Sequence, residues 1–343
     1  MKIAIISSAS ISVPPKTYGG GEFFVYNLCE GLIKLGQDIT LFATGDSITS
    51  AKLEYIFPST STIPQNFLDE SKHIFFSVQK IKEDNTFDIV QVNHPIALIY
   101  SNYLKIPMIY TMHFPKSIYL QKFISEYQNV NYVAISKNQA ENLEYPIKNL
   151  SIINHGIDSD FYEPSYNMGQ YLAYLGRFSK IKGVHYAIES AQLAREKIKV
   201  AGSCVFADDY AYYEEKLKFS LAYSNVEHIG EVSGKEKIKF LQNAKALLVP
   251  SIIDETFCLV IIEALMCGTP VIAFDKGPFR ELIEDGKTGF LVKEGDTKSL
   301  ALAIKKICLI NRKDCRNSAF EKFNYLKMTK SYLELFTKLK NIT

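Results

Sequence analysis

The segment at residues 255–263 carries two carboxylate side chains at a spacing that suits ligand binding. Its sequence, ETFCLVIIE, places Glu255 and Glu263 eight residues apart, one before and one inside a helix that we expect to begin near Phe257. A carboxylate at the mouth of a helix can accept hydrogen bonds from sugar hydroxyls, and one two turns along can hold a ribose diol. A helix N-terminus also favours a diphosphate, which here would face the backbone N–H groups of Thr256, Phe257, Cys258 and Leu259.

Two cations stand near the start of the same half of the chain. The run GRFSKIKG supplies Arg177 and Lys182 directly after an expected strand. Doubly wound sheets bind their ligands outside the carboxyl ends of strands, and both side chains suit the same diphosphate. The alternative is that each pairs with a nearby acid on the surface. A strand-end Gly-Arg beside a helix-opening Lys-Gly favours the anionic ligand.

Three consecutive glycines follow the first expected strand. Gly19, Gly20 and Gly21 stand directly before a helical pattern that begins at Phe24. Glycine lets backbone N–H groups approach a ligand closely, so the loop suits a phosphate or a sugar, and a flexible turn is the equally weighted alternative. The dinucleotide fingerprint GxGxxG is absent, and no acidic residue at the end of the second expected strand is clearly placed to bind a ribose, Asp46 being an ambiguous candidate. A nicotinamide enzyme is therefore disfavoured.

Short β-branched runs alternate with helical segments along most of the chain, which predicts an α/β fold with parallel sheets. The first series of expected strands is 2–7, 38–44, 88–93, 108–113, 132–136 and 150–154. The second is 171–175, 198–201, 226–229, 246–250, 270–274 and 289–292. The stretch 155–169 lacks periodicity and reads as a linker. From about Arg312, apolar residues at helical spacing predict one long terminal helix.

The composition excludes several classes of protein. The 343 residues include 39 basic and 37 acidic side chains, a net charge of +2, which argues against a nucleic-acid partner. The six cysteines form no CxxC pair and read as buried thiols of a reducing compartment, so we expect a cytoplasmic protein. The residues after Lys2 are too polar for a signal peptide, and no long apolar stretch predicts a membrane span.

Together, GRFSKIKG and ETFCLVIIEALMCGTPVIA resemble the nucleotide-sugar-dependent retaining glycosyltransferases of family 4, and PPKTYGGGEFF resembles that family's amino-terminal segment. The resemblance implies the GT-B fold, in which two Rossmann-like doubly wound domains face each other across a cleft. We therefore expect an acceptor domain at residues 1–156, a nucleotide-sugar donor domain at 157–320, and a helix at 321–343 that packs back across the domains.

The resemblance also implies roles for single residues. Arg177 and Lys182 would neutralise the leaving diphosphate, Glu255 would grip the donor sugar and Glu263 would bind the ribose. The remaining implied contacts are Gly20 and Gly21 with the donor, His113 with the transferring sugar, and Val232 with the base. His113 could instead be a core histidine, and His94 is a rival for the same place. The sequence departs from the family pattern at Cys258, where Gly or Ser is usual, and at His155, where Asn is usual.

The expected activity is transfer of a hexose, with retention, from a nucleoside diphosphate sugar to an acceptor hydroxyl in cell-surface glycan or glycolipid synthesis. UDP-sugars are the favoured donors and GDP-sugars the second choice, with no cofactor and no metal required. The acceptor would be a saccharide or a lipid-linked molecule, and peripheral contact with the inner face of the membrane stays open. The alternatives are an epimerase or phosphorylase of the same fold, or a two-lobed sugar-binding protein without catalysis.

Overall fold

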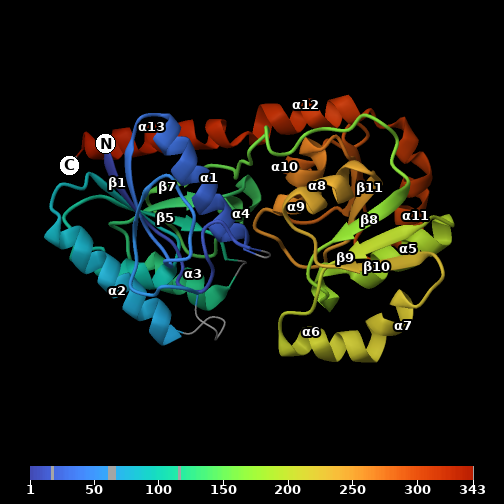
Figure 1. Ribbon diagram of the computed structural model, residues 1–343, viewed down its shortest axis with the longest axis horizontal. Helices are drawn as coiled ribbons and strands as arrows, with labels where there is room; N and C mark the ends of the chain where they lie inside the picture. The colour runs from blue at the N-terminus through green and yellow to red at the C-terminus, as the bar shows by residue number, and fades with distance from the viewer. Residues whose placement is uncertain (17–18, 61–66, 115–116, 343) are drawn as a thin grey trace. The chain divides into compact units, whose positions relative to one another are not determined.

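The computed structural model describes residues 1–16, 19–60, 67–114 and 117–342, and the chain divides into two units. Unit 1 comprises Met1–Ile157 and Tyr325–Thr343, and unit 2 comprises Asp158–Asn324. Each is a parallel β-sheet with helices packed against it (Figure 1). This confirms the predicted α/β class with two Rossmann-like sheets.

The sheet of unit 1 has seven strands in the order β3-β2-β1-β4-β5-β6-β7. They are β1 Lys2–Ile6, β2 Asp38–Phe42, β3 Lys52–Glu54, β4 Ile89–Val92, β5 Met108–Met112, β6 Asn131–Ala134 and β7 Leu150–Ile152. Six were predicted to within two residues at each end. The short edge strand β3 was not, because its sequence Lys-Leu-Glu is too short and too polar to show alternation.

Alternate side chains of these strands enter two separate cores, as the period of two in a strand requires. Ile3, Ile5 and Ile39 join one core with α1 (Gly20–Lys34) and α13 (Tyr325–Lys340). Ala4, Ile6 and neighbouring residues join the other, with α2 Phe67–Glu83, η1 Pro95–Tyr100 and α3 Ile118–Ser125. The short helix α4 (Lys137–Glu141) packs near β6 and β7. The sheet of unit 1 is therefore buried on both faces.

Unit 2 has a six-stranded sheet in the order β10-β9-β8-β11-β12-β13. Its strands are β8 Tyr171–Leu175, β9 Ile198–Ala201, β10 Val226–Gly230, β11 Ala244–Val249, β12 Val271–Phe274 and β13 Gly289–Val292, all predicted to within two residues. The strand order reverses between β8 and β11, so the carboxyl ends of these two strands flank the position where doubly wound sheets bind ligands.

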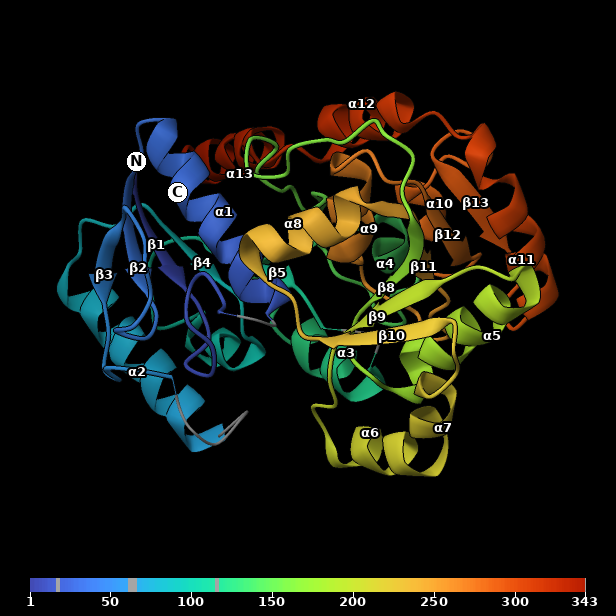
Figure 2. The same ribbon diagram turned by 45° about the vertical axis from the view of Figure 1, so that its right-hand side comes forward.

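Two groups of helices cover this sheet (Figure 2). Helices α8 (Gly234–Gln242), α9 (Leu259–Met266) and α12 (Arg312–Phe323) pack together, and α5 (Val184–Ala194) packs with α11 (Thr297–Lys306). The short elements are η2 Lys180–Lys182, α6 Ala207–Tyr212, η3 Tyr213–Leu217, α7 Lys218–Leu221, α10 Phe279–Leu282 and η4 Ile307–Leu309. Within the described ranges, no helix is both long and apolar enough to cross a membrane.

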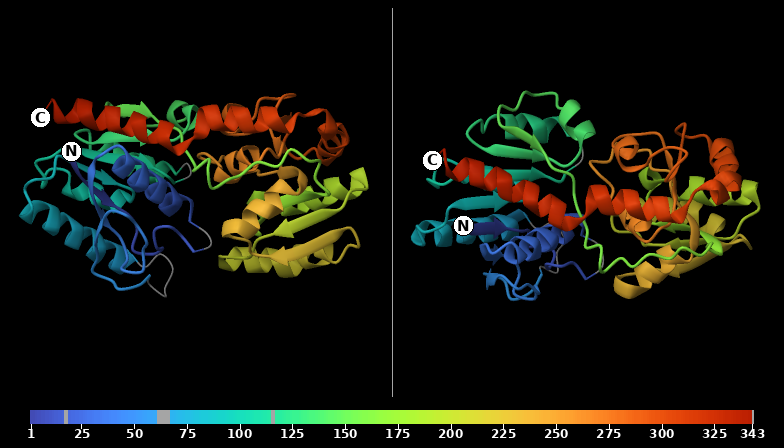
Figure 3. Two further views of the ribbon diagram at one scale, coloured as in Figure 1. Left: turned by 45° about the horizontal axis from the view of Figure 1, so that its top comes forward. Right: turned by 90° about the horizontal axis from the view of Figure 1, so that it is seen from above.

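The chain ends in two helices where the sequence predicted one. Helix α12 stops at Phe323 because Asn324 adopts an extended backbone, with φ −69° and ψ 133°. The Asn324 side chain donates to Ser159 Oγ at 3.0 Å within unit 2. Tyr325 N–H donates to Ile157 O within unit 1, where α13 begins and packs beside α1 (Figure 3).

Candidate active site

An ion pair in unit 2 joins two of the predicted site residues. Lys182, the last residue of η2, donates from Nζ to Oε1 of Glu255 at 2.6 Å. Ser251 Oγ donates to the same oxygen at 3.0 Å, just after the end of β11. Both charged side chains are partly buried, with exposed fractions of 28% for Lys182 and 15% for Glu255. The lysine is therefore held in place next to the proposed sugar-binding carboxylate.

The glycine after Lys182 explains how the lysine reaches the end of β11. Gly183 has a left-handed φ of 74°, and a Cβ there would lie 1.9 Å from Pro250 O. Only glycine tolerates both the φ and this backbone approach. The Lys-Gly pair of GRFSKIKG thus lets the loop after β8 pack directly against the residue that follows β11.

Arg177 lies in the same loop and contacts an acid that the sequence did not reveal. Its Nε is 3.3 Å from Asp209 Oδ2, which is ion-pair distance without the alignment of a hydrogen bond. Its guanidinium carbon lies 4.7 Å from the centre of the Phe206 ring. Asp209 is buried and accepts N–H bonds from Val205 and Phe206 at 3.1 Å each. Residues 205–209, which lead into and open α6, therefore fix the orientation of Arg177.

The segment that was expected to open a helix near Phe257 does so two residues later. Helix α9 begins at Leu259, and Cys258 caps it in a left-handed conformation with φ 95°. Glycine adopts this φ most easily, so the departure from the family pattern falls on a strained position. Burial raises the pKa of the Cys258 thiol well above its usual range. Cys258 therefore stays a neutral thiol and is no nucleophile.

Glu263 lies inside α9 and is held by two donors. It is only 3% exposed, and its Oε1 accepts from Tyr162 Oη and from Lys237 Nζ, each at 2.6 Å. Burial and the nearby carboxylate raise the pKa of Tyr162 well above its usual value, so the phenol remains a donor. Both partners are far from Glu263 in the sequence, and no local pattern could have revealed them.

His113 follows β5 in unit 1 and packs against two rings that also contact each other. Its ring centre lies 4.9 Å from that of Phe24 and 5.3 Å from that of His155, and its Nε2 is 2.8 Å from Asn93 Oδ1. Burial lowers the pKa of His113 to about 3, so the ring is neutral. His94, the rival candidate, instead caps η1 by accepting the Ile96 N–H at Nδ1.

The predicted site residues fall into two groups, one in each unit. Arg177, Lys182, Val232 and the segment 255–259 follow the carboxyl ends of β8, β10 and β11 in unit 2, and Glu263 lies one turn into α9. Gly20, Gly21 and His113 belong to unit 1, where a Cβ on Gly21 would lie 3.9 Å from the His113 ring. The glycines open α1 immediately beside the histidine.

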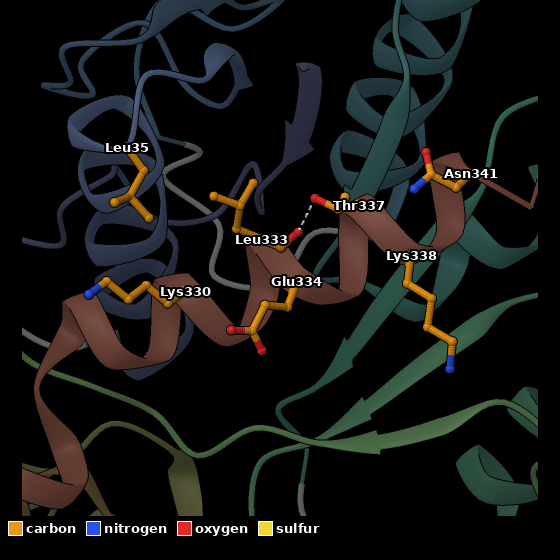
Figure 4. A pocket seen from close by; sticks show the side chains of 7 residues that line it. All are labelled: Leu35, Lys330, Leu333, Glu334, Thr337, Lys338 and Asn341. Carbon is orange, nitrogen blue, oxygen red and sulfur yellow. Dashed lines mark hydrogen bonds between the residues drawn. The ribbon is translucent and has the colours of Figure 1, made fainter.

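A surface hollow of about 470 Å³ in unit 1 lies apart from these residues (Figure 4). None of the predicted site residues lines it. The lining residues are Leu35, Lys330, Leu333, Glu334, Thr337, Lys338 and Asn341. Within the part of the chain that the structure describes, no group of three or more His, Cys, Asp or Glu side chains could hold a metal ion.

Solved structures are similar in fold to this chain over almost its whole length. The solved sucrose-phosphate synthase of Thermosynechococcus elongatus superposes with a TM-score of 0.84 at 19% identity, covering 100% of both chains. Anabaena HepE, solved in complex with UDP and glucose, superposes with a TM-score of 0.76 at 20% identity, covering 99% of this chain and 100% of that one. These likenesses support the predicted GT-B fold.

Two curated proteins are similar to this chain in sequence. Phosphatidyl-myo-inositol mannosyltransferase of Mycobacterium leprae is 26% identical over 332 residues, covering 89% of this chain and 86% of that protein. Lipopolysaccharide 1,2-N-acetylglucosaminetransferase of Salmonella typhimurium is 29% identical over 172 residues, covering 43% of this chain and 44% of that protein.

Two family models match successive parts of the chain. Residues 18–161 match "Glycosyltransferase Family 4", and residues 158–322 match "Glycosyl transferases group 1". The junction of the two matches falls at the start of unit 2. The motifs, the two sheets and the relatives point the same way, and the chain belongs to the family 4 glycosyltransferases.

Proposed function

We propose that this glycosyltransferase moves a hexose from a nucleoside diphosphate sugar to an acceptor hydroxyl, with retention of the anomeric configuration. The observation that carries the proposal is the ion pair of Lys182 with Glu255, beside the topological switch point of the unit 2 sheet. It puts a cation for a phosphate next to an acceptor for sugar hydroxyls, in the place where such sheets bind ligands.

Catalysis would rest on fixed charge. As the bond between the anomeric carbon and the diphosphate oxygen breaks, negative charge grows on the diphosphate. Arg177, Lys182 and the N-terminus of α9 would stabilise that charge, and they need little rearrangement because their partners already hold them. Each stabilising group of this kind is worth about 100-fold to 1,000-fold in kcat.

The acceptor hydroxyl would attack from the face that the diphosphate leaves. Its proton would pass to an oxygen of the departing diphosphate, so no carboxylate becomes a covalent nucleophile. Glu255 and Glu263 serve as binding groups for the sugar and the ribose, which separates this site from the paired acids of glycosidases. The products are the glycosylated acceptor and a nucleoside diphosphate.

UDP-sugars are the donors we favour, with GDP-sugars second. HepE has been solved with UDP and with UDP-glucose, which supports a UDP donor for a chain of the same fold. Among the relatives, one is named for transfer to phosphatidyl-myo-inositol and another for lipopolysaccharide. We accordingly infer a saccharide or lipid-linked acceptor, bound by unit 1, and an enzyme that contacts the membrane surface when the acceptor is a lipid.

The test is turnover with a panel of UDP-, GDP- and ADP-sugars in the presence of a mixed acceptor extract. We expect nucleoside diphosphate to be released with one donor class, at a rate that excess EDTA does not change. We also expect NMR to show that the anomeric bond of the product has the same configuration, axial or equatorial, as that of the donor. Inversion at the anomeric carbon would overturn retention, and EDTA-sensitive turnover would overturn metal independence. Donor binding without turnover across the panel would favour a sugar-binding protein.

A further inference from the structure

A chain of buried amides and hydroxyls lies beneath His113 in unit 1. Gln91 on β4 and Thr111 on β5 are fully buried, and Asn93, just after β4, is 9% exposed. Gln91 Nε2 donates to Thr111 Oγ1 at 3.0 Å, and Thr111 Oγ1 shares a 2.9 Å hydrogen bond with Tyr332 Oη on α13. The chain therefore connects the terminal helix to the residues around His113.

Backbone carbonyls fix which way both amides point. Asn93 Nδ2 lies 2.9 Å from Ile6 O, and Gln91 Nε2 lies 3.3 Å from Val92 O. A carbonyl oxygen can only accept, so each NH₂ group must face its carbonyl. The two amides also bond reciprocally, Asn93 Nδ2 to Gln91 Oε1 at 2.9 Å and Gln91 Nε2 to Asn93 Oδ1 at 3.0 Å. Reversing either amide would oppose two acceptors.

This orientation determines where His113 carries its proton. Asn93 presents Oδ1, an acceptor, to His113 Nε2 at 2.8 Å. The imidazole must therefore donate from Nε2, and in the neutral ring the other nitrogen, Nδ1, then has no proton. Phe24 and His155 pack on the ring and hold its plane. Both the tautomer and the orientation of His113 follow from its neighbours.

We propose that Asn93 is a positioning residue that holds His113 as the Nε2–H tautomer, which leaves Nδ1, an atom buried in this structure, as the acceptor of the ring. The inference rests on the proposed function, because the family resemblance assigns His113 to the transferring sugar. It adds a restriction to that assignment. Because Asn93 holds the one proton of the neutral ring, His113 does not act as an acid toward the leaving group.

The protonation of His113 can be measured without donor or turnover. Long-range ¹H–¹⁵N NMR of the full chain labelled at its six histidines separates protonated from unprotonated ring nitrogens, and the His113→Gln spectrum assigns the signals. We expect Nε2 protonated and Nδ1 unprotonated throughout pH 6–8. An Nδ1–H ring or an imidazolium in the wild-type protein would overturn the inference.

Variants then separate positioning from packing. Asn93→Ala removes the acceptor, so we expect a measurable fraction of the Nδ1–H tautomer and at least a tenfold lower kcat with the preferred donor. Asn154→Ala is the matched control, because Asn154 likewise donates to a carbonyl just after a strand, Ile135 O at 2.9 Å. It should leave the His113 tautomer and kcat unchanged.

The two readouts distinguish the inference from the proposed function. If the wild-type ring is Nε2–H and Asn93→Ala does not alter the ratio of tautomers, Asn93 is not the positioning residue. If Asn93→Ala does not fold, Thr111→Val tests the same chain one step away, and we expect it to retain the Nε2–H tautomer because Asn93 remains. If the tautomer responds but neither Asn93→Ala nor His113→Ala lowers kcat, the assignment of His113 to the donor sugar fails while its protonation stands.

Discussion

A ligand that binds Lys182 or Glu255 must compete with the ion pair between these two residues. In the structure the lysine is bound to the carboxylate, and a diphosphate would offer it a second and more concentrated negative charge. Because hydroxyls of the donor sugar would donate hydrogen bonds to Glu255 at the same time, binding of the whole donor would replace the pair without leaving either group unsatisfied. Under the proposed function, the pair would keep the site ordered before a donor binds.

Replacing Lys182 by alanine should lower kcat by about 100-fold or more, because the cation would act on charge that develops as the diphosphate leaves. Initial rates of nucleotide release measure this. Lys245→Ala is the matched control, since Lys245 forms an equally short 2.6 Å pair with Glu196 in the same unit and is similarly exposed, 26% against 28%. A similar loss of kcat in both variants would contradict a specific role for Lys182.

Cys258 offers a test of backbone strain at the entrance to α9. At φ 95° a Cβ is unfavourable, so Cys258→Gly should be more stable than Cys258→Ala by about 1 kcal/mol, once the greater unfolded-state entropy of glycine is allowed for. Urea unfolding of both variants measures the difference. If the alanine variant is the more stable, the position is not strained.

For single residues, the sequence revealed the motifs of the predicted site but not the residues that contact them. Arg177, Lys182, Glu255 and Glu263 stand out because each lies in a short run with a recognisable spacing. The residues that contact them lie 26 to 101 positions away in the sequence and belong to no recognisable motif. They are Asp209, Lys237 and Tyr162. Nothing local marks such residues, because their roles arise only when the strands of the sheet are paired.

Among the elements, α12 is attached to unit 2 by two arginines as well as by the buried residues Cys315, Ala319 and Phe323. Arg312, 8% exposed at the start of α12, donates to the carbonyls of Ser165, Ala244 and Gln242 and to Thr269 Oγ1, all at 2.7 or 2.8 Å. Arg316 donates to Met266 O at 2.8 Å, the end of α9. The helix that carries Glu263 is thus held at its carboxyl end by α12.

Arg312→Ala should destabilise unit 2 by about 3 kcal/mol, because four acceptors, two of them in buried bonds, lose a charged donor at once. Arg312→Lys should recover little of this, since an ammonium cannot reach acceptors arranged around a planar guanidinium. Urea unfolding followed by circular dichroism measures both, with the exposed neighbour Lys313→Ala as the control. Full recovery in the lysine variant would show that charge alone, and not the fork of donors, holds α12.

The elements themselves were largely predictable from periodicity, with two instructive exceptions. Strand β3 was not predicted because three residues are too few to show the alternation of a strand. The terminal helix was predicted as one because residues on both sides of Asn324 share helical spacing, yet Asn324 and Tyr325 form tertiary hydrogen bonds that break it. Local propensity cannot anticipate a break that depends on bonds to residues 157 and 159.

For the whole molecule, buried histidines make stability depend on pH. Burial lowers the pKa of His73, His94 and His185 to about 4 and that of His113 to about 3, and it lowers the pKa of His155 well below its usual value. On unfolding these rings regain a pKa near 6.5 and take up protons below that pH. The unfolded chain then binds more protons than the folded one, so stability falls as pH falls.

We expect the free energy of unfolding to drop by several kcal/mol between pH 7 and pH 5.5, at about 1 kcal/mol for each histidine. Glu22 opposes this in part, because burial raises its pKa to about 7 and it favours the folded state as pH falls through 7. Urea titrations at four pH values give the slope. His73→Phe should reduce it by about one proton, and an unchanged slope would show that His73 is already protonated in the folded state.

The most direct measurement for the whole enzyme is the dissociation constant of UDP, by calorimetry in EDTA, for the wild-type chain and for Glu263→Ala. We expect UDP to bind without metal and the substitution to weaken it about tenfold to 100-fold, the value of one or two hydrogen bonds to a carboxylate. Glu284→Ala, which removes another carboxylate paired with lysine in unit 2, should leave the constant unchanged. Equal affinity of Glu263→Ala and wild type, or no binding of any nucleoside diphosphate, would contradict a donor site built on α9.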